Sequence, residues 1–391
     1  MIPLKPSLRP ENPSFASGPC AKRPGWDLIH LKKALVQRSH RSVDGKVRLQ
    51  HVVNQHRSLL GIPADYCVAI VPGGDTGAFE MALWGMLGAC GVDVLAWDAF
   101  GEEWLYDIEQ ALKIPDLRKL TAPYGRLPDL TKVDCDRDVV FTWNGTTSGV
   151  CVPNGEWIDP GRKGLTFCDA TSAVFAYDMP WDRLDITTWS WQKVLGGEGA
   201  HGMIVLSPRA VERLRQYQPD RPIPRLFRMA KSGSFIEGIF AGETINTPSM
   251  LAVEDCADAL RWVEDSGGLV AAMDRVKKNY EAIATWVGHT AWADFLCGEE
   301  SCRSRTSICL SIVESGFQAL DEISRRAFIK NMCGLLEQEK AAFDIASHAR
   351  APAGLRIWCG ATVESSDVTA MLPWLDWAFQ STKNASGVSG A

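Results

Sequence analysis

The chain lacks the features that mark exported, membrane-spanning and nucleic-acid-binding proteins. None of its apolar runs approaches the length needed to cross a bilayer. Its first ten residues contain neither an apolar core nor a small-residue cleavage site, so we expect no signal peptide and a cytoplasmic location. The formal net charge of −6 argues against general nucleic-acid binding. It also means that an anionic substrate would need a local cluster of arginines.

Twelve cysteines are present, but none form a Cys-x-x-Cys pair. Neither a zinc site nor a redox motif is therefore indicated, and we expect no metal. In a cytoplasmic protein we expect these thiols to be reduced and mostly buried.

The order of apolar runs and turns indicates the fold class. Through the first half of the 391 residues, short apolar runs alternate with turns and helical patterns. The expected strands span 66–71, 92–97, 138–143, 165–169, 185–189 and 203–206. This rhythm is typical of an α/β protein whose largely parallel sheet carries helices on both faces. After about residue 290, strands at 306–312 and 355–358 and helices at 321–338 and 367–380 indicate a smaller α+β domain.

We divide the chain into four parts on this basis. They are an N-terminal arm (1–15), a large domain (16–266), a small C-terminal domain (267–380) and a flexible tail (381–391). Within the large domain, Asp27 is expected to cap a helix whose apolar residues, from Leu28 to Val36, share one face.

Candidate ligand-binding stretches follow several of the expected strands. Ligands of parallel sheets gather where the strands end, and Gly73–Gly77, Asn144–Gly149, Asp169 and Lys193 all lie after strands. A glycine turn that leads into a helix can bind an anion, because free N–H groups and the helix dipole both face the ligand. The alternative for Gly73–Gly77 is a plain tight turn.

Lys193 and Asp169 together suggest a particular chemistry. Lys193 lies between the aromatic stretch Trp189–Gln192 and a run rich in glycine, 24 residues after Asp169. A lysine can form a Schiff base with an aldehyde, and an aspartate can hold a pyridine nitrogen protonated, so the pair suits pyridoxal phosphate. Taken singly, a lysine is usually a surface residue and such an aspartate is often a helix cap. The nearby glycines, which allow close approach of the backbone, favour the functional interpretation.

A dinucleotide-dependent oxidoreductase is an alternative from another class. Residues 197–202 match the pattern G-x-G-x-x-G. However, the match leads into an expected strand rather than a helix, and Asp220 downstream lies in a proline-rich loop. The context therefore argues against this alternative.

Seven stretches, in order along the chain, resemble the phosphoserine aminotransferase family, a member of the class V aminotransferases with fold-type I architecture. They are Phe15-Ala-Ser-Gly-Pro19, Ser39-His40-Arg41, Gly73–Gly77, Asn144-Gly-Thr146, Asp169-Ala-Thr-Ser172, Gln192-Lys193 and Asn246-Thr247-Pro248, with a further match at His348, Arg350 and Arg356. The resemblance implies a large domain with a mainly parallel seven-stranded sheet between helices and a smaller α+β C-terminal domain.

The resemblance also implies roles for individual residues. Lys193 is similar to the family's Schiff-base lysine, which also moves the substrate proton, and Asp169 to the partner of the pyridine nitrogen. The other expected cofactor contacts are Thr146 at the ring hydroxyl, Trp104 stacked on the ring, Asp75, Thr76, Ser172 and Gln192 at the phosphate, and Asn246 and Thr247 at the phosphate of a neighbouring subunit. The expected substrate-binding residues are His40, Arg41, His348, Arg350 and Arg356, with Arg356 at the α-carboxylate and Arg41, His348 and Arg350 at the distal phosphate. Many family members carry an arginine near position 76, where this chain has threonine.

The activity implied is transfer of the amino group between L-glutamate and 3-phosphohydroxypyruvate, giving O-phospho-L-serine and 2-oxoglutarate in serine biosynthesis, by a homodimer with shared sites. Some family members also act on 4-phosphohydroxythreonine in pyridoxine biosynthesis. The alternatives are another class V enzyme, such as an alanine–glyoxylate or serine–pyruvate aminotransferase, and a catalytically silent protein of the same fold. The first would not need a second cationic cluster, and the presence of Lys193 and Asp169 speaks against the second.

Overall fold

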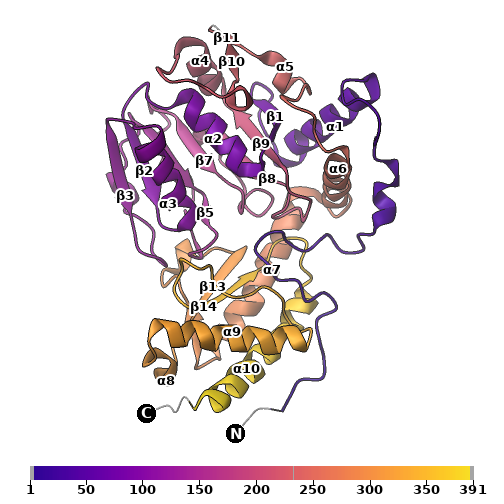
Figure 1. The fold of residues 1–391 in the computed structure, drawn as a ribbon, viewed down its shortest axis with the longest axis vertical. Helices are drawn as coiled ribbons and strands as arrows, with labels where there is room; N and C mark the ends of the chain where they lie inside the picture. The colour runs from indigo at the N-terminus through magenta and orange to yellow at the C-terminus, as the bar shows by residue number, and fades with distance from the viewer. Residues whose placement is uncertain (1–3, 232, 388–391) are drawn as a thin grey trace.

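A seven-stranded sheet lies at the centre of the larger domain of the computed structural model, which describes residues 4–231 and 233–387 (Figure 1). Its strand order is β1-β9-β8-β7-β4-β2-β3. The strands are β1 (Cys67–Pro72), β2 (Val92–Ala96), β3 (Leu117–Thr121), β4 (Asp138–Thr142), β7 (Thr166–Asp169), β8 (Ile186–Ser190) and β9 (His201–Leu206). Strands β3, β2, β4, β7 and β8 are parallel, whereas β9 runs antiparallel to both β8 and β1. The expected mainly parallel seven-stranded sheet is confirmed.

Helices cover both faces of this sheet. The side chains of Ala69 and Val71 on β1 belong to the core that includes α2 (Gly74–Met86), α3 (Ala99–Tyr106) and α4 (Pro208–Gln216). Val68 and Ile70, which point to the other face, belong to the core that includes α1 (Val43–Leu60) and α6 (Met250–Asp265). Because successive side chains of a strand face opposite sides, continuous apolar runs are required where both faces are covered.

A smaller domain lies below the sheet in Figure 1 and is reached through the long helix α7 (Gly268–Gly288). Its three antiparallel strands are β12 (Ala293–Phe295), β13 (Ser307–Ile312) and β14 (Gly354–Trp358), which pack with α8 (Ser315–Gln318), α9 (Glu322–Gln338) and α10 (Ser365–Ser386). The N-terminal arm runs along this domain: Trp374 Nε1 donates to Leu8 O at 2.6 Å and the amide of Glu11 donates to Asp367 at 2.7 Å. The remaining short elements are β5 (Asn144–Gly145), β6 (Val150–Cys151), β10 (Ala230–Lys231), β11 (Ser234–Phe235) and α5 (Glu237–Phe240).

The structure corrects two local expectations and adds one strand. The segment after Asp27 is a 3-10 helix that ends at Lys33, so its apolar side chains do not share a buried face, and Leu28 and Val36 are 69% and 52% exposed. Helix α10 continues through Ser386, so the tail expected from 381 is helical over 381–386, and 388–391 lie outside the described residues. Strand β3, at the sheet edge, was not expected from the sequence.

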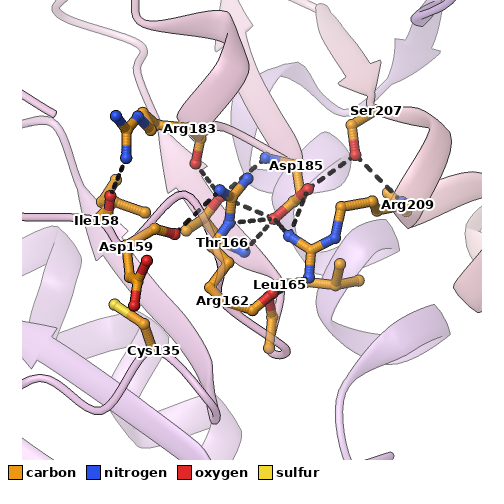
Figure 2. A network of polar contacts seen from close by, with 12 residues as sticks. Cys135, Ile158, Asp159, Arg162, Leu165, Thr166, Arg183, Asp185, Ser207 and Arg209 are labelled. Carbon is orange, nitrogen blue, oxygen red and sulfur yellow. Dashed lines mark hydrogen bonds and ion pairs between the residues drawn. The ribbon is translucent and has the colours of Figure 1, made fainter. Parts of the chain in front are cut away.

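A buried ionic network holds the edge of the sheet where the parallel strands begin (Figure 2). Asp185, directly before β8, accepts hydrogen bonds from the Arg162 guanidinium at 3.0 Å, from the Thr166 amide at 3.1 Å and from the Ser207 hydroxyl at 2.9 Å. Arg209 reaches the same carboxylate at 3.1 Å. One carboxylate therefore ties together β7, β8, β9 and the start of α4.

Among the described residues, we find no helix that combines the length and the apolar character required to span a membrane.

Candidate active site

A cavity of about 330 Å³ opens at the opposite edge of the sheet, where β4, β7 and β8 end. The predicted site residues that line it are Asp75, Thr76, Trp104, Thr146, Asp169, Gln192 and Lys193. These residues come from five separate stretches of the chain. They meet because parallel strands deliver the loops that follow them to one edge of the sheet.

Lys193 lies on the loop after β8 with its amine deep in the protein, although part of its side chain faces the open cavity. The amine donates to the backbone oxygen of Ser17 and lies 6.0 Å from the centre of the Trp358 ring. Burial lowers the pKa of Lys193, and the positive charge of Arg356 lowers this pKa further. A lysine in such surroundings loses its proton more readily than one in water.

The turn that carries Ser17 requires glycine at its next position. Gly18 has a φ of +141°, and a Cβ atom there would lie 2.6 Å from the Lys193 amine. The Phe15–Pro19 stretch therefore forms part of the wall around Lys193.

Asp169 ends β7 and is only 8% exposed. One carboxylate oxygen accepts from the indole nitrogen of Trp104 at 3.1 Å, and the other accepts from the amide of Thr171 at 3.0 Å. These two donors fix the orientation of the carboxylate toward the cavity. The Trp104 ring is buried, packs against Phe79 with ring centres 4.8 Å apart, and lines the cavity beside Asp169.

The glycine turn and the start of α2 form another wall of the cavity. Gly73 adopts the left-handed conformation with a φ of +85° and precedes the first turn of the helix. The N-terminus of a helix attracts anions through its free N–H groups and its dipole. The turn sits directly on β9, because a Cβ atom at Gly202 would lie 2.1 Å from the carbonyl oxygen of Gly74.

Asp75 places a second buried carboxyl group in the same cavity. Its backbone amide donates to Ser190 Oγ at 2.9 Å. Burial raises the pKa of the Asp75 carboxyl well above its ordinary value, and the neighbouring charge of Asp169 raises it further. The helix dipole would favour a charged Asp75 by about 0.3–1 kcal/mol. Repulsion between two adjacent partly buried charges is on the order of 4 kcal/mol and opposes the dipole, so the repulsion dominates.

Thr146 lines the cavity and is supported from behind by Ser172. Their hydroxyl oxygens lie 2.5 Å apart, and the carbonyl oxygen of Ser172 accepts from Asn144 Nδ2 at 3.1 Å and from Thr306 Oγ1 at 2.8 Å. Ser172 is buried but is not among the cavity-lining residues. Its placement indicates that it positions Thr146.

The small domain brings Arg356 and His348 near the cavity, although neither is among the residues that line it. Arg356 on β14 is close enough to Lys193 and His348 for its charge to lower the pKa of both, although burial is the larger cause at each. Its Nε atom is buried without a hydrogen-bond partner among the described residues. Arg350 is turned away from the cavity and pairs with Glu103 and, at 4.0 Å, with Glu102 of α3.

The remaining predicted residues lie away from the cavity. Arg41 lies just before α1, near enough to Glu243 to lower the pKa of that carboxyl, although Lys46 has the larger effect. Asn246 and Thr247 follow in the same loop and are exposed. His40 is half-buried beside Arg41, and burial lowers its pKa. None of these four side chains lines the cavity of the chain that carries it.

Phe100 is a site residue that the sequence analysis missed. It lies in the first turn of α3, is 39% exposed and lines the cavity. Its ring centre is 6.4 Å from that of His348, so it joins the large domain to the small one at the entrance. The available signal in the sequence was an aromatic residue four positions after Ala96, the last residue of β2.

Comparison with solved structures shows the fold of the protein. A phosphoserine aminotransferase of Cytophaga hutchinsonii superposes with a TM-score of 0.78 at 19% identity over 93% of this chain and 98% of that chain. An alanine–glyoxylate aminotransferase of Nostoc gives 0.76 at 17% identity over 97% of each. The molecule therefore has the fold-type I architecture of the class V aminotransferases, as expected.

Sequence similarity is more specific than the fold. No protein-family model matches the chain. A phosphoserine aminotransferase of Methanosarcina mazei, however, is 51% identical over 380 residues, which is 97% of this chain and 100% of the relative. The chain belongs to the phosphoserine aminotransferase family.

Proposed function

We propose that the protein is a pyridoxal-phosphate-dependent phosphoserine aminotransferase. It would transfer the amino group between L-glutamate and 3-phosphohydroxypyruvate, giving O-phospho-L-serine and 2-oxoglutarate. The observation that carries the proposal is one cavity lined by a buried lysine amine, an oriented carboxylate and the N-terminus of a helix.

The donor set of the cavity fits this cofactor. An amine with a lowered pKa suits its aldehyde, the Asp169 carboxylate suits a protonated ring nitrogen, and the start of α2 suits its phosphate. Gln192 Oε1 and Thr171 Oγ1, both of cavity-lining residues, are buried without partners among the described residues, as expected of groups that await a ligand. Lys193 would hold the aldehyde carbon, Asp169 the ring nitrogen and Thr146 the ring hydroxyl.

The protein's own groups would move and hold protons around the reacting carbon. When bound, pyridoxal phosphate supplies an electron sink for the bonds of the substrate α-carbon. The lowered pKa of Lys193 enlarges the fraction of neutral amine that can accept the Cα proton and later return it. Asp169, held in place by Trp104 and Thr171, would hold the ring nitrogen of the cofactor.

Arg356 would bind and orient the substrate. A guanidinium can hold a carboxylate through two parallel hydrogen bonds, which fixes its orientation as well as its position. The unpartnered buried Nε and the proximity to Lys193 support Arg356 as the α-carboxylate ligand. His348, close to Arg356, would contact the distal phosphate, and Arg350 would join it after leaving Glu103.

We also propose a homodimer in which His40, Arg41, Asn246 and Thr247 complete the site of the neighbouring subunit. Their position outside the cavity of their own chain supports this arrangement. Exposed apolar residues at Leu28, Val43 and Val47, in and before α1, would then be covered by the partner. A cytoplasmic location is proposed as well, since all twelve cysteines are free thiols.

An absorbance spectrum of the purified protein tests the cofactor and the reaction. We expect a visible band from bound pyridoxal phosphate that shifts when phosphoserine is added and shifts less with serine or alanine. Lys193→Ala should lose this band, whereas Lys163→Ala, which removes an exposed lysine, should keep it. A band that persists in Lys193→Ala, or equal responses to all three amino acids, would refute the assignment. Adding 4-phosphohydroxythreonine in the same assay shows whether the enzyme also serves pyridoxine biosynthesis.

A further inference from the structure

Two carboxyl groups, rather than one, face the cavity that would hold the cofactor ring. Asp75 in the first turn of α2 and Asp169 at the end of β7 are each 8% exposed and line the same cavity. They lie close enough that a proton on one can form a hydrogen bond to the other. The family resemblance implies a phosphate contact for Asp75, but this role does not say whether the carboxyl group is charged.

The partners of the two groups differ sharply. Asp169 accepts N–H hydrogen bonds through both of its oxygens, from Trp104 and Thr171. Asp75 Oδ1 is buried and has no partner among the described residues. A buried carboxyl oxygen that lacks a donor favours the neutral form of its group.

The charged and polar groups around Asp75 do not supply a compensating ion pair. The hydroxyls of Thr188 and Thr171 face it and favour its charged form, but burial and the charge of Asp169 outweigh them. Lys193, a cation within electrostatic reach of Asp75, donates its hydrogen bond to Ser17 instead. The dipole of α2 favours a charge at Asp75, but close repulsion from Asp169 outweighs the dipole.

We propose that Asp75 is a neutral carboxylic acid whose hydroxyl group donates a hydrogen bond to Asp169, so that the pair carries one negative charge. Asp75 is then a positioning residue: it holds the Asp169 carboxylate toward the ring nitrogen and keeps a second charge away from the anion site at the start of α2. Position 76 is a threonine here, so no cation in that turn offsets an additional carboxylate. The identity of the cofactor rests on the proposed function, whereas the protonation state of Asp75 does not.

Infrared spectroscopy tests the protonation state directly on the full-length protein, first without and then with pyridoxal phosphate. The difference between wild type and Asp75→Asn isolates the carbonyl band of the Asp75 acid, because other buried acids such as Asp98 contribute equally to both. We expect this band at neutral pH and expect it to disappear as the pH rises through the raised pKa of Asp75. In Asp169→Asn, the loss of the neighbouring charge should move this disappearance to lower pH. Absence of the band at neutral pH, or a transition unaffected by Asp169→Asn, would overturn the proposal.

Cofactor affinity gives a second, independent measurement. If Asp75 is neutral, Asp75→Asn should bind pyridoxal phosphate within about threefold of wild type at neutral pH, and only wild type should weaken as Asp75 loses its proton. If Asp75 is charged, removal of that charge should tighten binding about tenfold or more at neutral pH, which would overturn the proposal. Asp136→Asn, at an exposed position, is the matched control for loss of a carboxylate. A wild-type protein that binds no pyridoxal phosphate would refute the proposed function, while the infrared result on the unloaded chain would still decide the state of Asp75.

Discussion

Gly202→Ala should weaken both cofactor binding and the stability of the fold. A Cβ atom at Gly202 would lie 2.1 Å from Gly74 O and 2.8 Å from the Ala78 Cβ, whereas an ordinary contact requires at least 3.4 Å. The first turn of α2 must therefore move away from β9 by about 1.3 Å, the difference between 3.4 and 2.1 Å. This turn is the part of the cavity that would hold the cofactor phosphate.

The size of both effects follows from this displacement. Overpacking of this kind costs about 1–3 kcal/mol of unfolding free energy, or about 2–4 °C in Tm per kcal/mol for a large domain. One hydrogen bond to a charged group contributes about 1.5–3 kcal/mol, so its loss at the phosphate should reduce affinity about 10- to 100-fold.

Equilibrium titration with pyridoxal phosphate and thermal unfolding measure the two effects separately. Gly199→Ala is the matched control, because a Cβ atom there would meet Gln192 no closer than 3.9 Å. We expect the control to bind the cofactor like wild type. If Gly202→Ala binds within threefold of wild type and unfolds at the same temperature, the close packing of α2 on β9 does not shape the phosphate site.

Two further predictions concern ionic groups. Asp185→Ala leaves the buried guanidinium of Arg162 without its main partner and should reduce the unfolding free energy by about 3–5 kcal/mol in denaturant titrations, with cofactor affinity of the folded protein unchanged. Asp182→Ala, at an exposed position, should stay within about 0.5 kcal/mol of wild type, and an equal loss in the two variants would contradict the role given to the network. Single-turnover kinetics test the two substrate-binding arginines. Arg356→Ala should slow both half-reactions, whereas Arg350→Ala should slow the reaction of the phosphorylated ketoacid most. Equal losses for phosphorylated and unphosphorylated substrates in Arg350→Ala would count against this division.

The sheet and the main site could be predicted because both follow from local patterns and one general rule. Buried strands such as Cys67–Pro72 appear as uninterrupted apolar runs, and their ends were placed within one or two residues. Asp169 and Lys193 are 24 residues apart in the sequence, but each lies at or just after the end of a strand of the same sheet. The rule that ligands gather at strand ends therefore placed the two residues in one site.

Elements that depend on tertiary contacts could not be predicted in the same way. Strand β3 has the sequence Leu-Arg-Lys-Leu-Thr and lies half-exposed at the sheet edge, so it carries no apolar run. The segment Leu28–Lys33 has a helical spacing of apolar residues, but its side chains do not face the core of the chain. Pairing of Arg350 with Glu103 joins two domains across more than 200 positions, and no local pattern reports such a contact.

The N-terminal segment connects helix α10 of the small domain to Lys193 of the large domain. Leu8 and Glu11 form hydrogen bonds with side chains of α10. Further along, the carbonyl oxygen of Phe15 accepts from the Trp358 amide at 3.0 Å, and that of Ser17 accepts from the Lys193 amine. A shift of the smaller domain therefore pulls on the peptide group that touches the reactive amine. The ten residues from Leu8 to Ser17 thus link helix α10 to the peptide group that accepts from the Lys193 amine.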